Sequence, residues 1–199
     1  MEDSLFSLSA LVALLPAAFF SLKRSDGGRR EEGRNATFWL TLAIAVTGPL
    51  VWVFFNMSGT WQTGLSTTLW VIIAVSMIIF ASITLLNDNA WRLTPLLIPY
   101  MGLLAFFAIF WQHIPEARPL INSPGSWIKA HILISVTTYA LVTIAAVSAL
   151  SAFIQDRALK TKCPTNLSRK LPSVAESESL LVRLLIIGEI VLSMGLATG

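Results

Sequence analysis

Long apolar runs alternate with short polar connectors along most of this chain. A helix needs roughly 17 to 25 mostly apolar residues, rising about 1.5 Å each, to cross a bilayer. Runs that meet this requirement cover residues 4–22, 37–56, 67–86, 95–111, 127–155 and 180–199. The pattern therefore predicts an all-α fold, a polytopic transmembrane helix bundle with six spans that forms one integral membrane domain over residues 1–199.

Composition supports a membrane location and excludes several other classes of protein. Hydrophobic residues make up 55% of the chain and charged residues 13%, and the mean hydropathy is +0.71. The first run begins with Glu2 and Asp3 rather than basic residues, and no A-x-A site follows it, so we expect a retained span rather than a signal peptide. The single cysteine, Cys163, excludes an internal disulfide, a C-x-x-C relay and covalent c-type haem attachment.

The basic residues predict how the spans are oriented. Twelve of the fourteen lysines and arginines fall in the connectors 23–36 and 156–179, or beside them at Arg92 and Arg183. Basic connectors stay in the cytoplasm, so we expect the two loops to be cytoplasmic and the N-terminus to be outside. The outer loops then carry only Arg118, with Lys129 at the start of the fifth span.

Several local signals concern how helices begin and pack. Ser173 is a candidate N-cap, with Glu176 three residues later as its partner in a capping box. Gly48–Pro49 interrupts the second span, and we interpret it as a packing kink rather than a gate. Gly188 and Gly195 give the sixth span a small-residue edge suited to close helix contact.

His131 is the candidate that could carry chemistry. It lies in "SWIKAHILISVTTYALVTIAA", one turn after Trp127 and on the same helix face as Ser135 and Thr138, while the other faces are apolar. This spacing predicts that the imidazole faces the bundle or an outer cavity. It either bonds to a neighbouring helix or marks a substrate or cofactor site, and imidazole is a common haem ligand. The residues alone leave these alternatives open.

Two further titratable residues stand out. His113 lies in the outer loop "FWQHIPEARPLINSPGSW", where it is either solvated or part of a haem-contacting surface. Glu189 lies about nine residues into the sixth span, and burying it ionised costs about 2.5 kcal/mol or more. We expect a protonated carboxyl bonded to Ser135 or Ser148, and the alternative is a proton or substrate path. No nucleophile, base or phosphate-loop pattern predicts catalysis.

The C-terminal third of the chain resembles a known family. The segment "KAHILISVTTYALVTIAAVSALSAFIQDRALK", followed by "LPSVAESESLLVRLLIIGEIVLSMGLATG", is similar to cytochrome c assembly proteins of the CcsA, CcmC and HemX type. The resemblance covers residues 127–199 and includes Tyr139 and Gln155 to Arg157. It implies that His131 is an axial ligand to haem b at the outer face of the membrane, with Trp127 in a supporting role. The implied location is the bacterial plasma (inner) membrane.

The resemblance also implies partners and shows one departure. Expected partners are haem, apocytochrome c, other assembly subunits and the lipid bilayer, with no nucleic acid. The tryptophan-rich outer loop, the later helices and a second outer histidine of that family are absent from these 199 residues. We therefore expect a C-terminally truncated fragment of the short HemX-like branch.

Three functions compete at this point. The first is a membrane protein of cytochrome c biogenesis that binds or presents haem, more as a non-enzymatic assembly factor than as an enzyme. The second is a small-solute transporter or permease with proline-broken helices and Glu189 along a pathway, although no inverted repeat supports it. The third is a structural subunit of a larger membrane complex.

Overall fold

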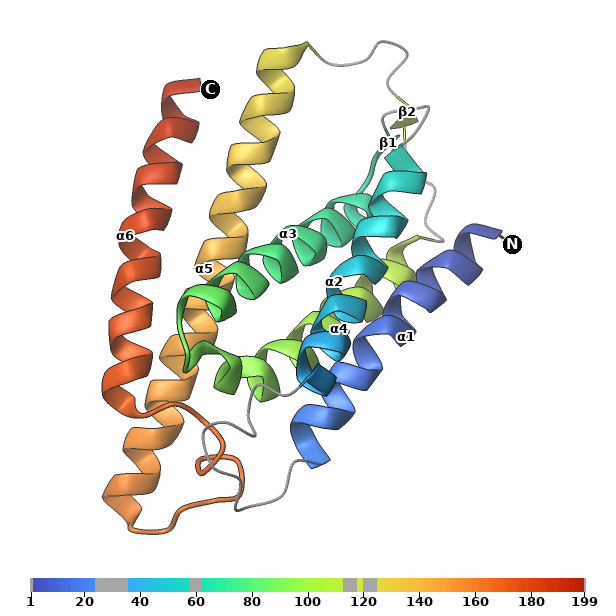
Figure 1. The fold of residues 1–199 in the computed structure, drawn as a ribbon. Helices are drawn as coiled ribbons and strands as arrows, with labels where there is room; N and C mark the ends of the chain where they lie inside the picture. Colours follow the sequence, from blue (N-terminus) through green and yellow to red (C-terminus); the bar gives the residue numbers. More distant parts are fainter. Residues whose placement is uncertain (1, 24–35, 58–61, 113–117, 120–124, 199) are drawn as a thin grey trace.

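The computed structural model describes residues 2–23, 36–57, 62–112, 118–119 and 125–198. Most of these residues lie in helices (Figure 1). The helices are α1 (Glu2–Lys23), α2 (Ala36–Met57), α3 (Leu65–Leu86), the short 3-10 helix η2 (Ala90–Leu93), α4 (Thr94–Trp111), α5 (Ser126–Thr161) and α6 (Val174–Thr198). Two short strands, β1 (Gln62–Thr63) and β2 (Arg118–Pro119), pair antiparallel, with Gln62 opposite Pro119.

Five helical segments of the described chain are long and apolar enough to cross a membrane. They are Ala36–Asn56, Leu65–Leu86, Ala90–Trp111, Ser126–Thr161 and Val174–Thr198. The predicted multi-pass helical membrane protein is therefore confirmed. In the first predicted span, α1 has 22 residues, but the apolar segment described in it is the shorter Ser7–Ala17. A membrane crossing by α1, and with it the count of six spans, therefore stays a prediction.

Two predicted spans differ from the helices that contain them. Helix α5 continues past the expected end at residue 155 to Thr161, and α6 begins at Val174 rather than at residue 180. The extra turn of α5 is polar and contains a Lys160–Asp156 ion pair of 2.6 Å at i,i+4 spacing. Hydropathy marks where the apolar surface ends, and these helices continue beyond that surface.

Helix α6 begins with the capping box that the sequence predicted. The backbone N–H of Glu176 donates to Ser173 Oγ at 3.3 Å, and that of Ser173 donates to Glu176 Oε2 at 3.0 Å. The other carboxylate oxygen, Oε1, accepts a bond of 2.6 Å from the side-chain amide of Asn89, which precedes η2. One acid therefore caps α6 and fastens its start to the turn between α3 and α4.

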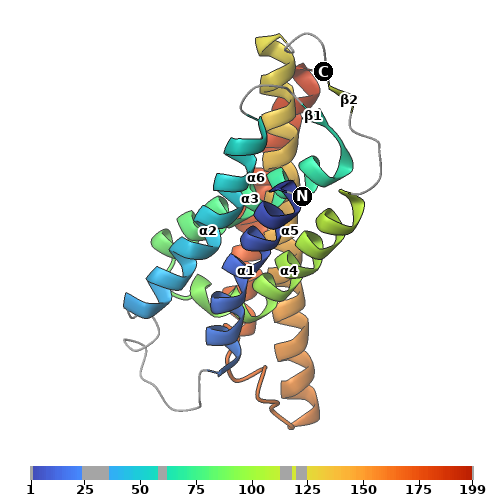
Figure 2. The same ribbon diagram turned by 90° about the vertical axis from the view of Figure 1, so that its right-hand side faces the viewer.

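The helices form a bundle with α3 near its centre and α6 at its edge (Figures 1 and 2). Helix α1 packs on α2 and α4, α3 packs on α2, α4 and α5, and α6 packs mainly on α5. Fully buried side chains from several helices fill the core. They include Trp70, Ile73, Met77, Phe80, Leu97, Met101 and Ile144.

Glycines permit the closest helix contacts. A Cβ added at Gly48 would lie 2.5 Å from Ala13 Cβ, so only glycine lets α2 approach α1 this closely. Helix α2 continues through Pro49, which agrees with the packing interpretation. Gly188 and Gly195 are buried in α6, and a Cβ on Gly195 would lie 3.2 Å from Ile134 of α5.

Helices α5 and α6 are also joined by a buried pair of hydroxyls. Ser151 Oγ lies 3.1 Å from Ser177 Oγ, and both residues are at most 1% exposed. Hydroxyls buried in an apolar bundle need a partner, so this contact favours one axial register between the two antiparallel helices.

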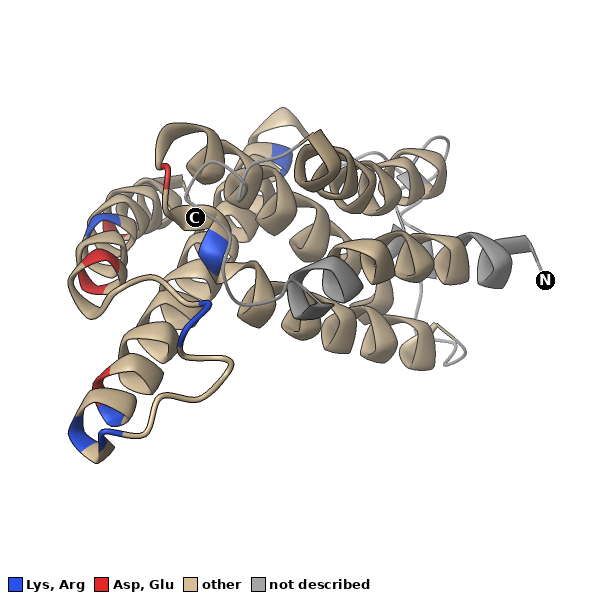
Figure 3. Ribbon diagram, turned by 60° about the horizontal axis from the view of Figure 1, so that its bottom comes forward, with Lys and Arg blue, Asp and Glu red and all other residues tan. Residues whose placement is uncertain are grey.

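The two ends of the bundle differ in chemistry. The start of α5, the end of α6 and the β1–β2 pair lie together at the top of Figure 1, and we call this the ribbon end. At the opposite end, lysines and arginines gather on the end of α5 and the loop 162–173 (Figure 3), and we call this the basic end.

Candidate functional site

Helices α5 and α6 meet at the ribbon end through two side chains of α5. The Trp127 Nε1–H donates to the backbone oxygen of Thr198 at 2.8 Å. The Nδ1 of His131 lies 3.3 Å from Thr198 Oγ1. Trp127 and His131 are four residues apart on α5, so both side chains reach the last turn of α6.

The Thr198 hydroxyl favours one tautomer of His131. Its Oγ1 donates to the backbone oxygen of Gly195 at 2.9 Å, and a hydroxyl has only one proton to donate. Used in this way, Oγ1 is an acceptor for His131, which matches the neutral ring with its proton on Nδ1. The Nε2 of this tautomer keeps its lone pair, which is the form of imidazole that ligates a metal.

The site is fixed on one side and open on another. His131 is half-buried, whereas the Trp127 side chain is 65% exposed. One turn after His131, the hydroxyl of Ser135 donates to the His131 backbone oxygen at 2.9 Å. In the same turn of α5, Ile134 packs closely on Gly195 of α6. The imidazole therefore lies against α6 at the outer edge of the helix pair.

Glu189 does not have the surroundings expected from the sequence. Its side chain is exposed on α6, although it lies within an apolar span. The hydroxyl of Ser135 donates to the backbone oxygen of His131, and that of Ser148 donates to the backbone oxygen of Ile144 at 3.0 Å. Among the residues described here, no hydrogen bond joins Glu189 to either serine, because Glu189 lies on an exposed face of α6.

His113 lies outside the described residues, so the structure does not place it relative to His131. Within the described ranges, no group of three His, Cys, Asp or Glu side chains is close enough to hold a metal ion. His131 is therefore not part of such a group within the described ranges.

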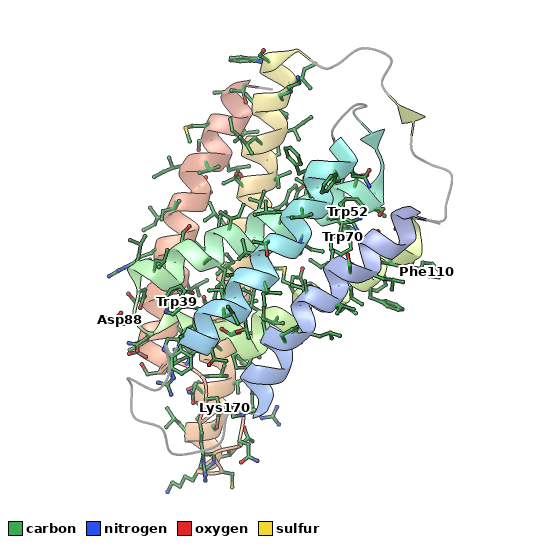
Figure 4. All side chains as sticks on the ribbon, turned by 45° about the vertical axis from the view of Figure 1, so that its right-hand side comes forward. Trp39, Trp52, Trp70, Asp88, Phe110 and Lys170 are labelled. Atoms are coloured by element: carbon green, nitrogen blue, oxygen red, sulfur yellow. The ribbon has the colours of Figure 1, made fainter. Side chains whose placement is uncertain are left out.

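A second polar contact at the ribbon end lies inside the α1–α4 part of the bundle. Trp52 Nε1 donates to Ser7 Oγ at 2.9 Å, and that hydroxyl donates to Gln112 Oε1 at 2.8 Å. The Trp52 ring stacks on Trp70 with centroids 5.2 Å apart (Figure 4). Both tryptophans are buried, so they are packing residues rather than exposed interfacial anchors.

The sequence named His131 and Trp127 as candidates but gave no signal for Thr198, which contacts both side chains. The partner lies 67 residues along the chain from His131 and in a different helix. No local motif links the two positions. Only the register between α5 and α6 brings them together, and single-sequence periodicity does not determine that register.

Comparison with known proteins extends the resemblance over almost the whole chain. Residues 5–199 match the family described as Cytochrome C assembly protein, well beyond the segment 127–199 that the motifs covered. The chain is 46% identical over 198 residues to a protein of Azospirillum brasilense named "Uncharacterized 28.8 kDa protein in nifR3-like 5'region", covering all of this chain and 73% of that protein. No solved structure matches the present chain. The chain therefore belongs to the cytochrome c assembly protein family, which gives it a role in cytochrome c biogenesis.

Proposed function

We propose that this protein binds haem b at the ribbon end and presents it at the outer face of the membrane for cytochrome c assembly. His131 Nε2 is the axial ligand to the iron. The observation that carries this proposal is the position of the Thr198 hydroxyl, which donates to the backbone oxygen of Gly195 and lies 3.3 Å from His131 Nδ1. This bond orients the ring and leaves the ligating nitrogen unprotonated. The family match favours this function over a transporter or a structural subunit.

The neighbouring residues suit a flat, mostly apolar cofactor. Trp127 exposes most of its ring one turn beyond His131, and its Nε1–H is held by Thr198, so the indole offers a fixed aromatic surface. His113, which precedes α5 in the sequence, is a further candidate for contact with the haem, distinct from the family's second outer histidine. When bound, haem supplies the iron and is itself the group to be attached to apocytochrome c. Attachment belongs to partner subunits, so this chain acts as a non-enzymatic assembly factor.

The proposed orientation puts the ribbon end outside a bacterial plasma membrane. The basic end carries Lys160, Lys162 and Arg169, and basic loops are retained in the cytoplasm. Apocytochrome c and other assembly subunits then reach the haem from outside, where the start of α5 is exposed.

A haem titration tests the ligand. We expect the purified protein to give a Soret band, and His131→Ala to lose most of it because no imidazole then binds the iron. Added imidazole restores the band in His131→Gly if Nε2 is the missing ligand. Thr137→Val is the matched control, since the Thr137 hydroxyl bonds within its own helix at 2.8 Å. An unchanged Soret band in His131→Ala rejects the proposal.

The single cysteine tests the orientation. Cys163 is exposed in the loop at the basic end. An impermeant maleimide should label it only after the cells are permeabilised. In a Cys163→Ser background, Ser126→Cys at the start of α5 should label in intact spheroplasts. Labelling of Cys163 in intact cells reverses the topology and removes the outer haem site.

A further inference from the structure

A cavity of about 510 Å³ lies at the basic end, far from His131. The end of α5 and the loop 162–173 form most of its wall, and η2 contributes Arg92. Its volume falls within the range of about 300 to 1,000 Å³ that is usual for ligand sites. The cavity is independent of the proposed haem site.

The wall of this cavity is held in place by two side chains. The two protons of the Gln155 amide nitrogen are shared among three backbone carbonyls of the loop that follows α5, and Arg92 donates to two more. The Gln155 bonds reach Ser168 O at 2.7 Å, Leu171 O at 3.1 Å and Pro172 O at 3.0 Å. The Arg92 bonds, each 3.2 Å, join Nε to Lys170 O and Nη2 to Arg169 O. The loop is therefore braced from two helices, and the cavity is preformed.

The cavity is positively charged. Arg92, Lys162 and Arg169 line it, and none of the described residues that line it is Asp or Glu. Each basic residue near a membrane surface attracts an anionic lipid by about 1 kcal/mol.

The lining of the cavity also has an apolar part. Leu159, Pro164 and Leu171 form this part of the wall.

The length of α5 indicates where the cavity lies relative to the membrane. Between His131 and Gln155, α5 rises about 36 Å at 1.5 Å per residue, compared with a hydrocarbon core of about 30 Å. If His131 lies at one face of the bilayer, this cavity therefore lies at the opposite interface.

We propose that this cavity binds the headgroup of an anionic phospholipid in the cytoplasmic leaflet. Lys162 and the two arginines contact the phosphate, and the apolar wall contacts the glycerol and the first acyl carbons. A free phosphate ion has the same charged group but gains nothing from Leu159, Pro164 and Leu171. The mixed lining therefore favours a lipid.

Lys162 offers a clean test because its backbone is left-handed, with φ of 54°. Asparagine tolerates this conformation better than most residues, so Lys162→Asn removes the charge with little backbone strain. Lys160→Gln is the matched control, since Lys160 is two residues away and does not line the cavity. The probes are dioctanoyl phosphatidylglycerol and dioctanoyl phosphatidylcholine, titrated against the full protein in a neutral detergent and followed by native mass spectrometry.

We expect the wild-type protein to prefer phosphatidylglycerol, and Lys162→Asn to weaken that binding about fivefold, the effect of one basic residue. Lys160→Gln should bind as the wild type does. Equal binding of the two lipids, or equal loss in both variants, overturns the proposal. Full displacement of phosphatidylglycerol by millimolar inorganic phosphate also overturns it, because the site would then recognise the free ion. The haem spectrum of Lys162→Asn should be unchanged, which separates this test from that of His131.

Discussion

The most informative substitution at the proposed haem site is Thr198→Val, which leaves the ligand itself in place. Valine keeps the branched shape of threonine but replaces Oγ1 with a methyl group. The backbone oxygen of Thr198 remains available to Trp127. The change therefore removes the acceptor near His131 Nδ1, together with the bond from Oγ1 to the backbone oxygen of Gly195.

The size of the effect follows from the length of that bond. Removing the outer partner of a metal-bound histidine costs about 10- to 100-fold in affinity. The Nδ1–Oγ1 distance of 3.3 Å is at the long end for a hydrogen bond, so we expect the lower limit. Haem affinity should fall about tenfold, which is about 1.4 kcal/mol at 25 °C.

The assay is a haem titration of the purified protein, read at the Soret band, with Thr198→Ser as the matched variant. Serine keeps the hydroxyl and should keep the wild-type affinity. If Thr198→Val binds haem as tightly as the wild type, the hydroxyl does not orient the ligand. If Thr198→Ser loses as much affinity as Thr198→Val, the effect belongs to packing at the end of α6.

Two further predictions concern stability. Gly48→Ala places a methyl group 2.5 Å from Ala13 Cβ, so α1 and α2 must separate. We expect a loss of about 1–3 kcal/mol in unfolding by SDS, and an unchanged midpoint would contradict the close contact. Glu176→Ala removes the capping box of α6 and the bond to Asn89. It should cost about 1–2 kcal/mol in the same assay, whereas Glu178→Ala on the exposed face should cost little.

Features that depend on nearby residues were predictable from the sequence. Apolar runs gave the spans from α2 to α6, because a membrane segment must satisfy its backbone internally and cover its surface with apolar side chains. The Ser173–Glu176 capping box is a contact over three residues, and its spacing alone identifies it. The spacing of Gly188 and Gly195 likewise predicted the close contact of α6 with a neighbouring helix.

Features that depend on helix register were not predictable. Thr198 contacts His131 only because α5 and α6 pack in one axial register. Glu189 shows the same limit: its place in the span was correct, but the face it occupies follows from how α6 packs on α5. Hydropathy along one chain contains no information on that packing.

The buried hydroxyl pair between α5 and α6 acts at a distance. It lies about 30 Å from His131 along α5, and Thr198 lies about as far from Ser177 along α6. Because each helix is stiff, fixing the register at Ser151 and Ser177 also fixes it at His131 and Thr198. A shift of α6 by one turn along α5 would move Thr198 about 5.4 Å past the imidazole. The position of the His131 imidazole relative to Thr198 at the ribbon end thus depends on two serine hydroxyls near the basic end.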